Sequence, residues 1–143
     1  MSVPPPQPPF FDHEKLLVYR RSISFVAWCE ELMQARQLTG DLRSQLARAA
    51  TSIPLNIAEG NGKTSPRDRC RYLESARGSA LECAACLDVL TATKRISQDE
   101  ATRGKRDLRE IVSMLTGLIA AVSDRAGEAE GQYLAEANES GIG

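Results

Sequence analysis

The sequence predicts an all-α fold, namely an antiparallel, up-down-up-down four-helix bundle. Its 143 residues suit a single domain. Aromatic residues make up only 5% of the chain, while alanine and leucine are abundant, which favours helices over sheets. Apolar residues recur every three or four positions in four successive segments of about 20–28 residues, separated by short turn signals. No alternation typical of a β-strand competes with this pattern.

The first helix is expected over residues 12–37. Asp12 is a plausible N-cap, and the apolar positions Leu16, Tyr19, Ile23, Val26 and Met33 follow with helical spacing. Residues 1–11 precede it as a proline-rich arm, because five of the seven prolines lie within the first nine residues. Such a composition favours an extended polyproline conformation. The arm either stays disordered or docks onto a neighbouring subunit or an aromatic groove.

The second helix is expected over residues 41–60, capped by Asp41 after Gly40. Its apolar positions are Leu42, Leu46, Ala49, Ile53 and Ile57. Pro54 lies inside this lane and should bend the helix, because proline removes one backbone hydrogen bond. The string Gly60-Asn61-Gly62 indicates a C-terminal cap and a turn.

The third and fourth helices are expected over residues 66–93 and 98–124. Ser65 and Pro66 are a typical N-cap and first-turn pair, and Ser97 with Glu100 forms a capping box. The third helix carries a heptad seam of Leu73, Ala76, Ala80, Cys83, Leu87 and Leu90. The fourth carries Leu108, Ile111, Leu115, Leu118 and Val122 at the same spacing.

Residues 125–143 form an acidic tail, which we expect to be disordered or a short helix that docks weakly. From Asp124 onward the chain has one arginine against five carboxylates, a net charge of −4, whereas the whole chain carries −1. The remainder is therefore mildly basic, at +3. This balance excludes a uniformly basic nucleic-acid-binding protein but allows a local basic patch. The tail either keeps the protein soluble or competes with nucleic acid for a basic face.

Few residues are candidates for catalysis or metal binding. Cys83 and Cys86 have metal-like spacing, but no second such pair exists and the only histidine is His13. We therefore interpret these cysteines as small core residues rather than metal ligands or redox groups, and His13 as a solvated residue rather than a general base. We expect no metal, no cofactor and no catalytic residues, so the protein is predicted not to be an enzyme. The sequence shows no secretory leader and no apolar run that would cross a membrane, which predicts a cytoplasmic protein with reduced thiols.

A polar lane runs beside the apolar lane on the second and third helices. Its members are Gln45, Arg48, Ser52, Asn56 and Glu59 on the second helix, and Arg71, Ser75, Ser79 and Glu82 on the third. An antiparallel hairpin centred near Ser65 pairs Arg48 with Glu82, Ser52 with Ser79, Asn56 with Ser75 and Glu59 with Arg71. The two charged pairs are predicted salt bridges, and a slip of one residue in the turn would exchange Arg71 for a neighbour such as Arg67. The lane is either a network that fixes register or a subunit interface, or a ligand-binding groove.

Basic residues gather in two stretches that an antiparallel bundle places at opposite ends. The first holds Lys63, Arg67, Arg69, Arg71 and Arg77, and the second holds Arg103, Lys105, Arg106 and Arg109. Each stretch is either a solvated helix face or, repeated around a symmetric ring, an electropositive rim. Of these residues, Lys63, Arg67, Arg69 and Arg77 are the candidate nucleic-acid contacts.

The run from Leu46 to Gly60, with the string Ser-Ile-Pro-Leu-Asn-Ile-Ala-Glu-Gly over 52–60, resembles the signature of a known family. This is the family of four-helix-bundle proteins encoded in intervening sequences of bacterial 23S rRNA genes. Tyr72-Leu73 and the string Gly-Ser-Ala-Leu-Glu over 78–82 resemble its next block. The signature falls on Arg48, Ser52, Pro54, Asn56, Glu59, Gly60, Gly78, Ser79 and Glu82, most of which lie on the polar lane.

The resemblance implies an antiparallel bundle that assembles into a homo-oligomeric ring, typically a pentamer, without recognised enzymatic activity. Similar proteins act as accessory factors of diversity-generating retroelements, where they bind nucleic acid and a reverse transcriptase. This chain departs from those basic relatives in its near-neutral charge, which weakens the nucleic-acid interpretation because phosphate affinity follows cation count. We therefore expect a pentameric accessory or scaffold protein that recognises a partner protein or structured RNA. Direct nucleic-acid binding at the end shared by the second and third helices is the alternative, and an enzyme using the polar lane is a third.

Overall fold

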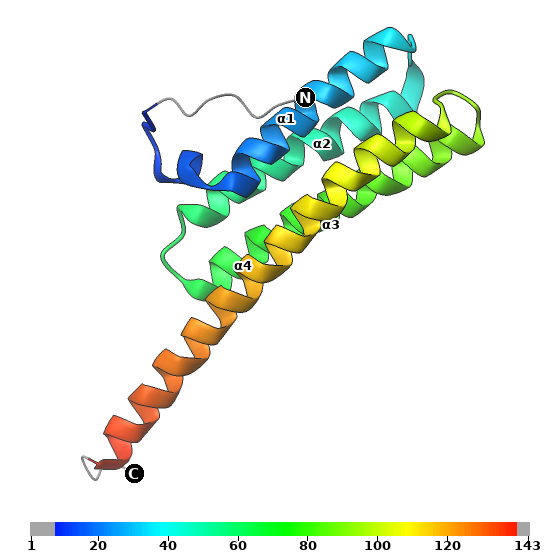
Figure 1. Cartoon of the computed structure of the whole chain (residues 1–143). Helices are drawn as coiled ribbons and strands as arrows, with labels where there is room; N and C mark the ends of the chain where they lie inside the picture. Colours follow the sequence, from blue (N-terminus) through cyan, green and yellow to red (C-terminus); the bar gives the residue numbers. More distant parts are fainter. Residues whose placement is uncertain (1–7, 140–143) are drawn as a thin grey trace.

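The computed structural model describes residues 8–139, apart from the side chains of residues 128–130. Within this range the chain is all-α and no strand occurs. Its elements are a short 3-10 helix η1 (Asp12–Lys15) followed by the helices α1 (Leu17–Ala35), α2 (Gly40–Asn61), α3 (Pro66–Ala92) and α4 (Gln98–Glu139). The four long helices pack side by side and are joined by short turns at alternating ends (Figure 1). The predicted all-α four-helix bundle is confirmed.

The beginning of the first helix differs from the prediction. Instead of one helix over 12–37, η1 and α1 are separated at Leu16, whose φ of −73° and ψ of 125° are extended. Asp12 does not cap a long helix, because its carboxylate accepts a hydrogen bond from Asn61 Nδ2 at 3.1 Å. Glu14 closes the turn before η1 by accepting from the backbone N–H of Phe10, at 3.0 Å. These contacts hold η1 against the end of α2, so the chain must change direction before it enters the bundle. Residues 1–7 of the predicted arm lie outside the described residues.

The fourth helix extends well past its predicted end near residue 124. It continues to Glu139, so of the two alternatives for the tail residues 125–139 are helical rather than disordered, as a continuation of α4 and not as a separate short helix. Residues 140–143 lie outside the described part. This segment has no proline and is rich in alanine and glutamate, which are strong helix formers. The predicted end near residue 124 was placed where the apolar lane stops. The end of this lane marks where α4 stops packing against the bundle, and not where the helix ends.

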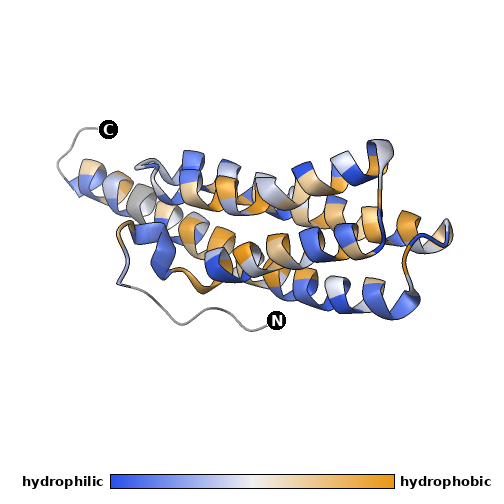
Figure 2. Ribbon diagram, turned by 90° about the horizontal axis from the view of Figure 1, so that it is seen from above, coloured by the Kyte–Doolittle hydropathy of each residue, from blue (hydrophilic) through white to orange (hydrophobic). Residues whose placement is uncertain are grey.

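The burial of their side chains in the core confirms the predicted apolar lanes of α3 and α4. All six seam residues of α3 are buried, as are Leu108, Ile111, Leu115 and Val122 of α4. Hydrophobic residues of the helices face one another across the bundle interior (Figure 2). On α1 the buried face includes Ser22, Phe25 and Cys29, whereas Ile23 of the predicted lane is 42% exposed. Two lanes on α1 have helical spacing, and the one that contains the bulky Phe25 faces the core.

The starts of α3 and α4 are capped as predicted, whereas the start of α2 is not. Asp68 N–H donates to Ser65 Oγ at 3.4 Å at the start of α3. At the start of α4, Glu100 N–H donates to Ser97 Oγ at 3.1 Å, and Ser97 N–H donates to Glu100 Oε1 at 2.9 Å, which completes the capping box. For α2 the predicted Asp41 cap is wrong, because the helix already begins at Gly40, with Thr39 in the cap position.

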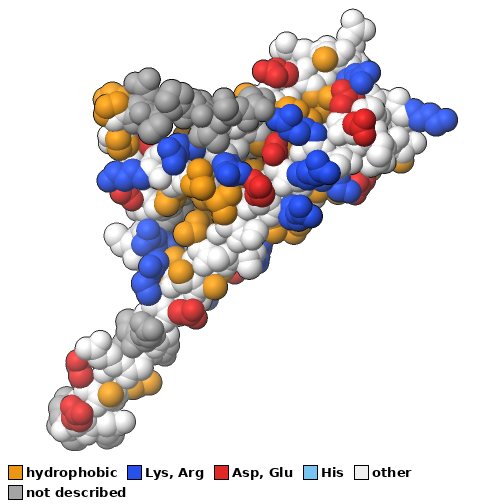
Figure 3. Space-filling model, viewed as in Figure 1, with side chains coloured by type: hydrophobic (Ala, Val, Ile, Leu, Met, Phe, Trp, Pro, Cys, Tyr) orange, Lys and Arg blue, Asp and Glu red, His pale blue; other side chains and the backbone are white. Residues whose placement is uncertain are grey.

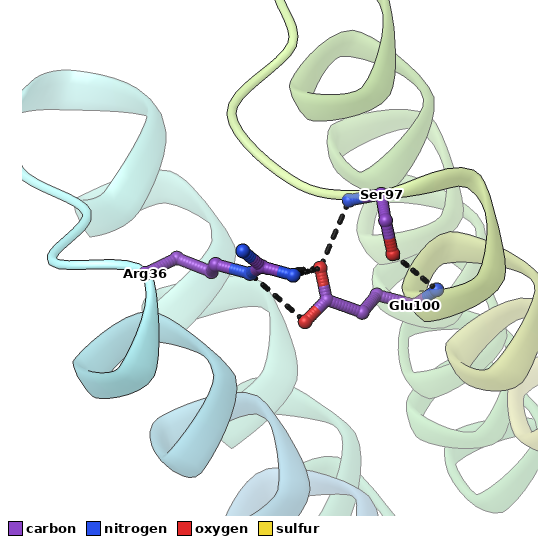
Figure 4. A network of polar contacts seen from close by, with 3 residues as sticks. All are labelled: Arg36, Ser97 and Glu100. Carbon is purple, nitrogen blue, oxygen red and sulfur yellow. Dashed lines mark hydrogen bonds and ion pairs between the residues drawn. The ribbon is translucent and has the colours of Figure 1, made fainter.

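Arg36 joins this capping box to the end of α1. Its Nε donates to both carboxylate oxygens of Glu100, at 2.9 and 3.0 Å, and its Nη2 lies 2.8 Å from Oε1 (Figure 4). Such a bidentate pair is the strongest geometry available to an arginine and a carboxylate. The contact ties the first and last long helices together at one end of the bundle.

Pro54 is buried inside α2, and the helix continues through it from Gly40 to Asn61.

Cys83 and Cys86 are buried, which confirms their interpretation as small core residues. No helix in the described range is long and apolar enough to span a bilayer.

Candidate functional site

The centre of the polar lane lies where α2 packs against α3. The hydroxyls of Ser52 and Ser79 are 2.9 Å apart and hydrogen-bonded, which confirms that predicted pair. Asn56 Nδ2 donates to the carbonyl oxygen of Ser52 at 2.8 Å and to its Oγ at 2.9 Å. The predicted Asn56–Ser75 pair is wrong, because Ser75 Oγ donates to the carbonyl of Arg71 at 3.1 Å. The half-buried serines and Asn56 therefore form a small network that sets the register of the two helices.

Neither predicted salt bridge of the lane forms among the described residues. Glu82 instead accepts a hydrogen bond from Gln45 Nε2 at 3.4 Å, and Arg71 lies 3.8 Å from Asp68. The reason is exposure, because Arg48, Glu59, Arg71 and Glu82 all lie on the surface of the bundle. Long charged side chains in water gain only about 0–1 kcal/mol from pairing, so a matching register does not bring them together.

The outer side of the lane is a shallow groove of about 560 Å³, which we call the α2 groove. Its lining residues are Ala47, Arg48, Thr51, Ser52, Leu55, Asn56, Glu59 and Tyr72. Arg48 and Glu59 stand three helical turns apart, about 16 Å along α2. Leu55 lies between them and is 61% exposed. The groove thus offers a cation at one end, a carboxylate at the other and an apolar surface between, which suits docking of a larger molecule.

The signature glycines have different roles. A Cβ on Gly60 would lie 2.9 Å from Tyr72 Cβ and 3.4 Å from the carbonyl oxygen of Arg69. Gly60 therefore lets α2 approach α3 closely. The predicted cap and turn follow directly after it, because α2 ends at Asn61 and Gly62 is its C-cap. Around Gly78 no described atom lies within 4 Å of the Cβ position, apart from the neighbouring residues and backbone of its own helix. No contact within the chain explains a glycine there.

The four candidate nucleic-acid contacts do not share one face. Lys63 Nζ lies over the Tyr72 ring, 5.2 Å from its centroid, and Arg77 Nη1 donates to Thr116 Oγ1 on α4 at 3.3 Å. Arg69 lies near η1, where its charge contributes to lowering the pKa of Asp12, after the larger effects of hydrogen bonds from Asn61 and Lys15. Arg67 is exposed at the beginning of α3.

The described residues offer little for catalysis or metal binding. Burial raises the pKa of the Cys83 thiol to about 12, and it also raises the pKa of Cys29 and Cys86. These thiols are protonated at neutral pH and so are poor nucleophiles and poor metal ligands. Among the side chains that the structure describes, no group of three or more His, Cys, Asp or Glu could hold a metal ion. His13 packs between aromatic rings, with its centroid 5.9 Å from Phe11 and 4.7 Å from Tyr19.

Sequence reasoning missed a second hollow, of about 520 Å³, between α3 and α4. We call it the α3/α4 groove, and its lining residues are Ala80, Leu81, Ala84, Thr102, Lys105, Arg106, Leu108, Arg109 and Val112. Two small residues one turn apart on α3, Ala80 and Ala84, leave the space. Their spacing was visible in the sequence, but which residues of α4 would face them was not.

The family comparison and one solved structure agree with this geometry. Residues 14–117 match the family described as 23S rRNA-intervening sequence protein, which is more than half of the chain. The chain belongs to this family. Among curated proteins, the comparison found no match.

A crystal structure of a protein of unknown function from the S23 ribosomal protein family of Bacteroides thetaiotaomicron is similar to this chain, with a TM-score of 0.68 and 25% identity. The similarity covers 98% of that chain but 72% of this one. The part of α4 beyond residue 117 therefore lies outside the family match, whereas the polar lane and the α2 groove lie within it.

Proposed function

We propose that this family member is a non-enzymatic accessory or scaffold protein that assembles into a homo-oligomeric ring, a pentamer by family resemblance. The ring recognises a partner protein or a structured RNA. The observation that carries the proposal is the α2 groove, where signature residues surround the exposed Leu55 instead of converging in an enclosed pocket. A long groove with an apolar centre and charged ends is suited to holding another macromolecule.

The charge of the chain favours recognition through shape and apolar contact over binding to phosphates. The net charge is −1, and the α2 groove has one cation and one carboxylate at its ends. Non-specific nucleic-acid affinity comes mainly from lysine and arginine contacts to phosphates, which such a groove does not supply.

Direct nucleic-acid binding is the second candidate, and a separate observation favours it. The connection from α2 to α3 and the first turns of α3 carry Lys63, Arg67, Arg69 and Arg71 within nine residues, with Asp68 as the single carboxylate among them. Repeated around a ring, this stretch would form a basic rim even though its side chains diverge within one copy.

The test is binding of a structured RNA and of duplex DNA to the purified oligomer, after its mass has been verified, at about 50 and 200 mM salt. The accessory role predicts either no binding or RNA binding that survives Arg67→Ala, Arg69→Ala and Arg77→Ala together. Direct binding through four phosphate contacts predicts an affinity loss on the order of 100-fold between the two salt concentrations. If the triple variant abolishes such binding, the second candidate replaces the first.

A further inference from the structure

The end of α4 extends beyond the bundle that it helps to form. Among the side chains described on α4, Val122 is the last that is buried, and the helix continues to Glu139. We call residues 123–139 the α4 extension, which is about 25 Å long. It projects past the other helices (Figure 1) and shows hydrophobic and acidic side chains along its far part (Figure 3).

The α4 extension carries exposed apolar side chains on an acidic background. Tyr133 is 71% exposed and its neighbour Leu134 is 55% exposed. The sequence of the extension has one arginine against five carboxylates, which include Glu136 and Glu139. A protruding helix with an aromatic and a leucine side chain in water and a net charge of −4 resembles one partner of a helix-in-groove contact.

The α3/α4 groove has the complementary properties. Its floor is apolar, and its edge combines Leu81, which is 55% exposed, with Lys105, Arg106 and Arg109. Lys105 pairs with Asp88 at 2.7 Å, whereas in the described part of the chain Arg106 and Arg109 form no ion pair. The groove therefore presents an apolar trough with two cations that lack a carboxylate partner among the described side chains.

The α4 extension cannot occupy the groove of its own chain. One wall of the groove, from Thr102 to Val112, belongs to the same continuous helix that continues into the extension. A straight helix cannot fold back onto its own side, so the extension can reach such a groove only in a second copy. The wall is about 15 Å long, which the extension exceeds.

We propose that the α4 extension of one copy docks into the α3/α4 groove of the next copy, with Tyr133 and Leu134 on the apolar floor and the acidic residues near Arg106 and Arg109. Every copy both offers an extension and receives one, so the contact is heterologous and propagates head to tail. Such a contact closes into a ring when its rotation allows. This inference rests on the assembly in the proposed function and specifies the surfaces that join the copies.

The direct test compares the solution mass of the full-length chain with that of the double variant Tyr133→Asp, Leu134→Asp, by light scattering after size exclusion. Wild-type protein should have a multiple of 15.6 kDa, and the variant should have 15.6 kDa with an unchanged helical circular dichroism spectrum. Both side chains are exposed in the single copy, so the substitutions leave the bundle core intact. Leu55→Asp is the control for an added carboxylate: it introduces one instead of two, on an exposed leucine of the α2 groove, and should retain the wild-type mass.

A charge-reversal series tests the polar part of the contact. Arg106→Glu with Arg109→Glu should raise the dissociation constant of the assembly at least tenfold. Adding Glu136→Lys and Glu139→Lys to the same chain should restore much of the affinity, because each reversed extension then meets a reversed groove in the next copy. Lys94→Glu, on the turn between α3 and α4, is the charge control and should have little effect.

Different results would overturn different statements. If the Tyr133 and Leu134 variant keeps the wild-type mass, the docking inference is wrong, while the ring and its accessory function stand. If only Leu55→Asp dissociates the assembly into single copies, the α2 groove is the interface between copies and the docking inference is again wrong. If wild-type protein itself has a mass of 15.6 kDa, both the inference and the proposed ring are refuted.

Discussion

Replacing glycine by alanine should have opposite effects on the free energy of unfolding at Gly60 and at Gly78. Both are helical and both lie in the strings that resemble the family signature, but they differ in what a methyl group would meet. At Gly60 a Cβ would lie 2.9 Å from Tyr72 Cβ and 3.4 Å from the Arg69 carbonyl oxygen. These atoms are close to or part of the backbone of α3, so they cannot move aside as the end of a flexible side chain does. At Gly78 a Cβ would have no described atom within 4 Å apart from the neighbouring residues and backbone of its own helix.

The magnitudes follow from two terms. Replacing glycine by alanine inside a helix gains roughly 0.5–1 kcal/mol, because alanine has less backbone freedom to lose on folding. At Gly78 only this term applies, so Gly78→Ala should raise the free energy of unfolding by that amount. At Gly60 the overlap with α3 costs about 1–3 kcal/mol and outweighs the gain. Gly60→Ala should therefore be destabilising by about 1–2 kcal/mol, or by several degrees in Tm.

The assay is urea or thermal unfolding of the wild type and both variants at one protein concentration, followed by circular dichroism. A stable Gly60→Ala variant would refute the close approach of α2 to α3 at this residue. A destabilised Gly78→Ala variant would refute the open surroundings of Gly78 and would indicate that another copy packs against it.

Three further predictions concern helix ends and the polar network. Lys94 has a φ of +60° at the end of α3, a conformation that glycine adopts more easily, so Lys94→Gly should raise the unfolding free energy by about 1 kcal/mol in a thermal melt while Lys94→Ala should not. Partial burial by itself raises the pKa of Glu100, but hydrogen bonds from Arg36 and the capping serine outweigh it and the pKa is lowered. Because the folded-state pKa lies below the unfolded one, the carboxylate stabilises the fold above the unfolded-state pKa, and this contribution is lost as the pH falls through the folded-state value. Stability measured against pH should therefore decline less on acidification in Glu100→Gln than in wild type, and an equal decline would contradict the assignment. Ser52→Ala and Ser79→Ala should each cost about 1–2 kcal/mol, and the double variant should cost less than their sum, because one shared hydrogen bond is lost in all three; additive costs in a denaturant series would refute a shared contact.

Much of the fold was predictable because it depends on local patterns. The heptad seam of α3 and the lane of α4 identified buried residues correctly, since helical periodicity dictates which side chains share a face. Ser65, Ser97 and Glu100 cap their helices as expected, because capping involves residues three positions apart.

The polar lane was predictable only in its half-buried part. The Ser52–Ser79 pair forms because short side chains at a helix interface have few alternatives to each other. Arg48 and Glu82 matched in register but lie exposed, where water competes with the partner. Charge matching along two helices therefore indicated which faces meet without determining which charges pair.

The sequence by itself determined the four-helix architecture, the buried seams of α3 and α4, the caps at the starts of these two helices and the family, because each follows from residues close together along the chain. Only the tertiary structure decided that Gly60 serves a close helix contact, that α4 continues past the bundle to Glu139, and that Ala80 and Ala84 open a groove beside Arg109. These features depend on distances between separate helices and on exposure to water, and neither quantity is encoded in the spacing of residues along one helix.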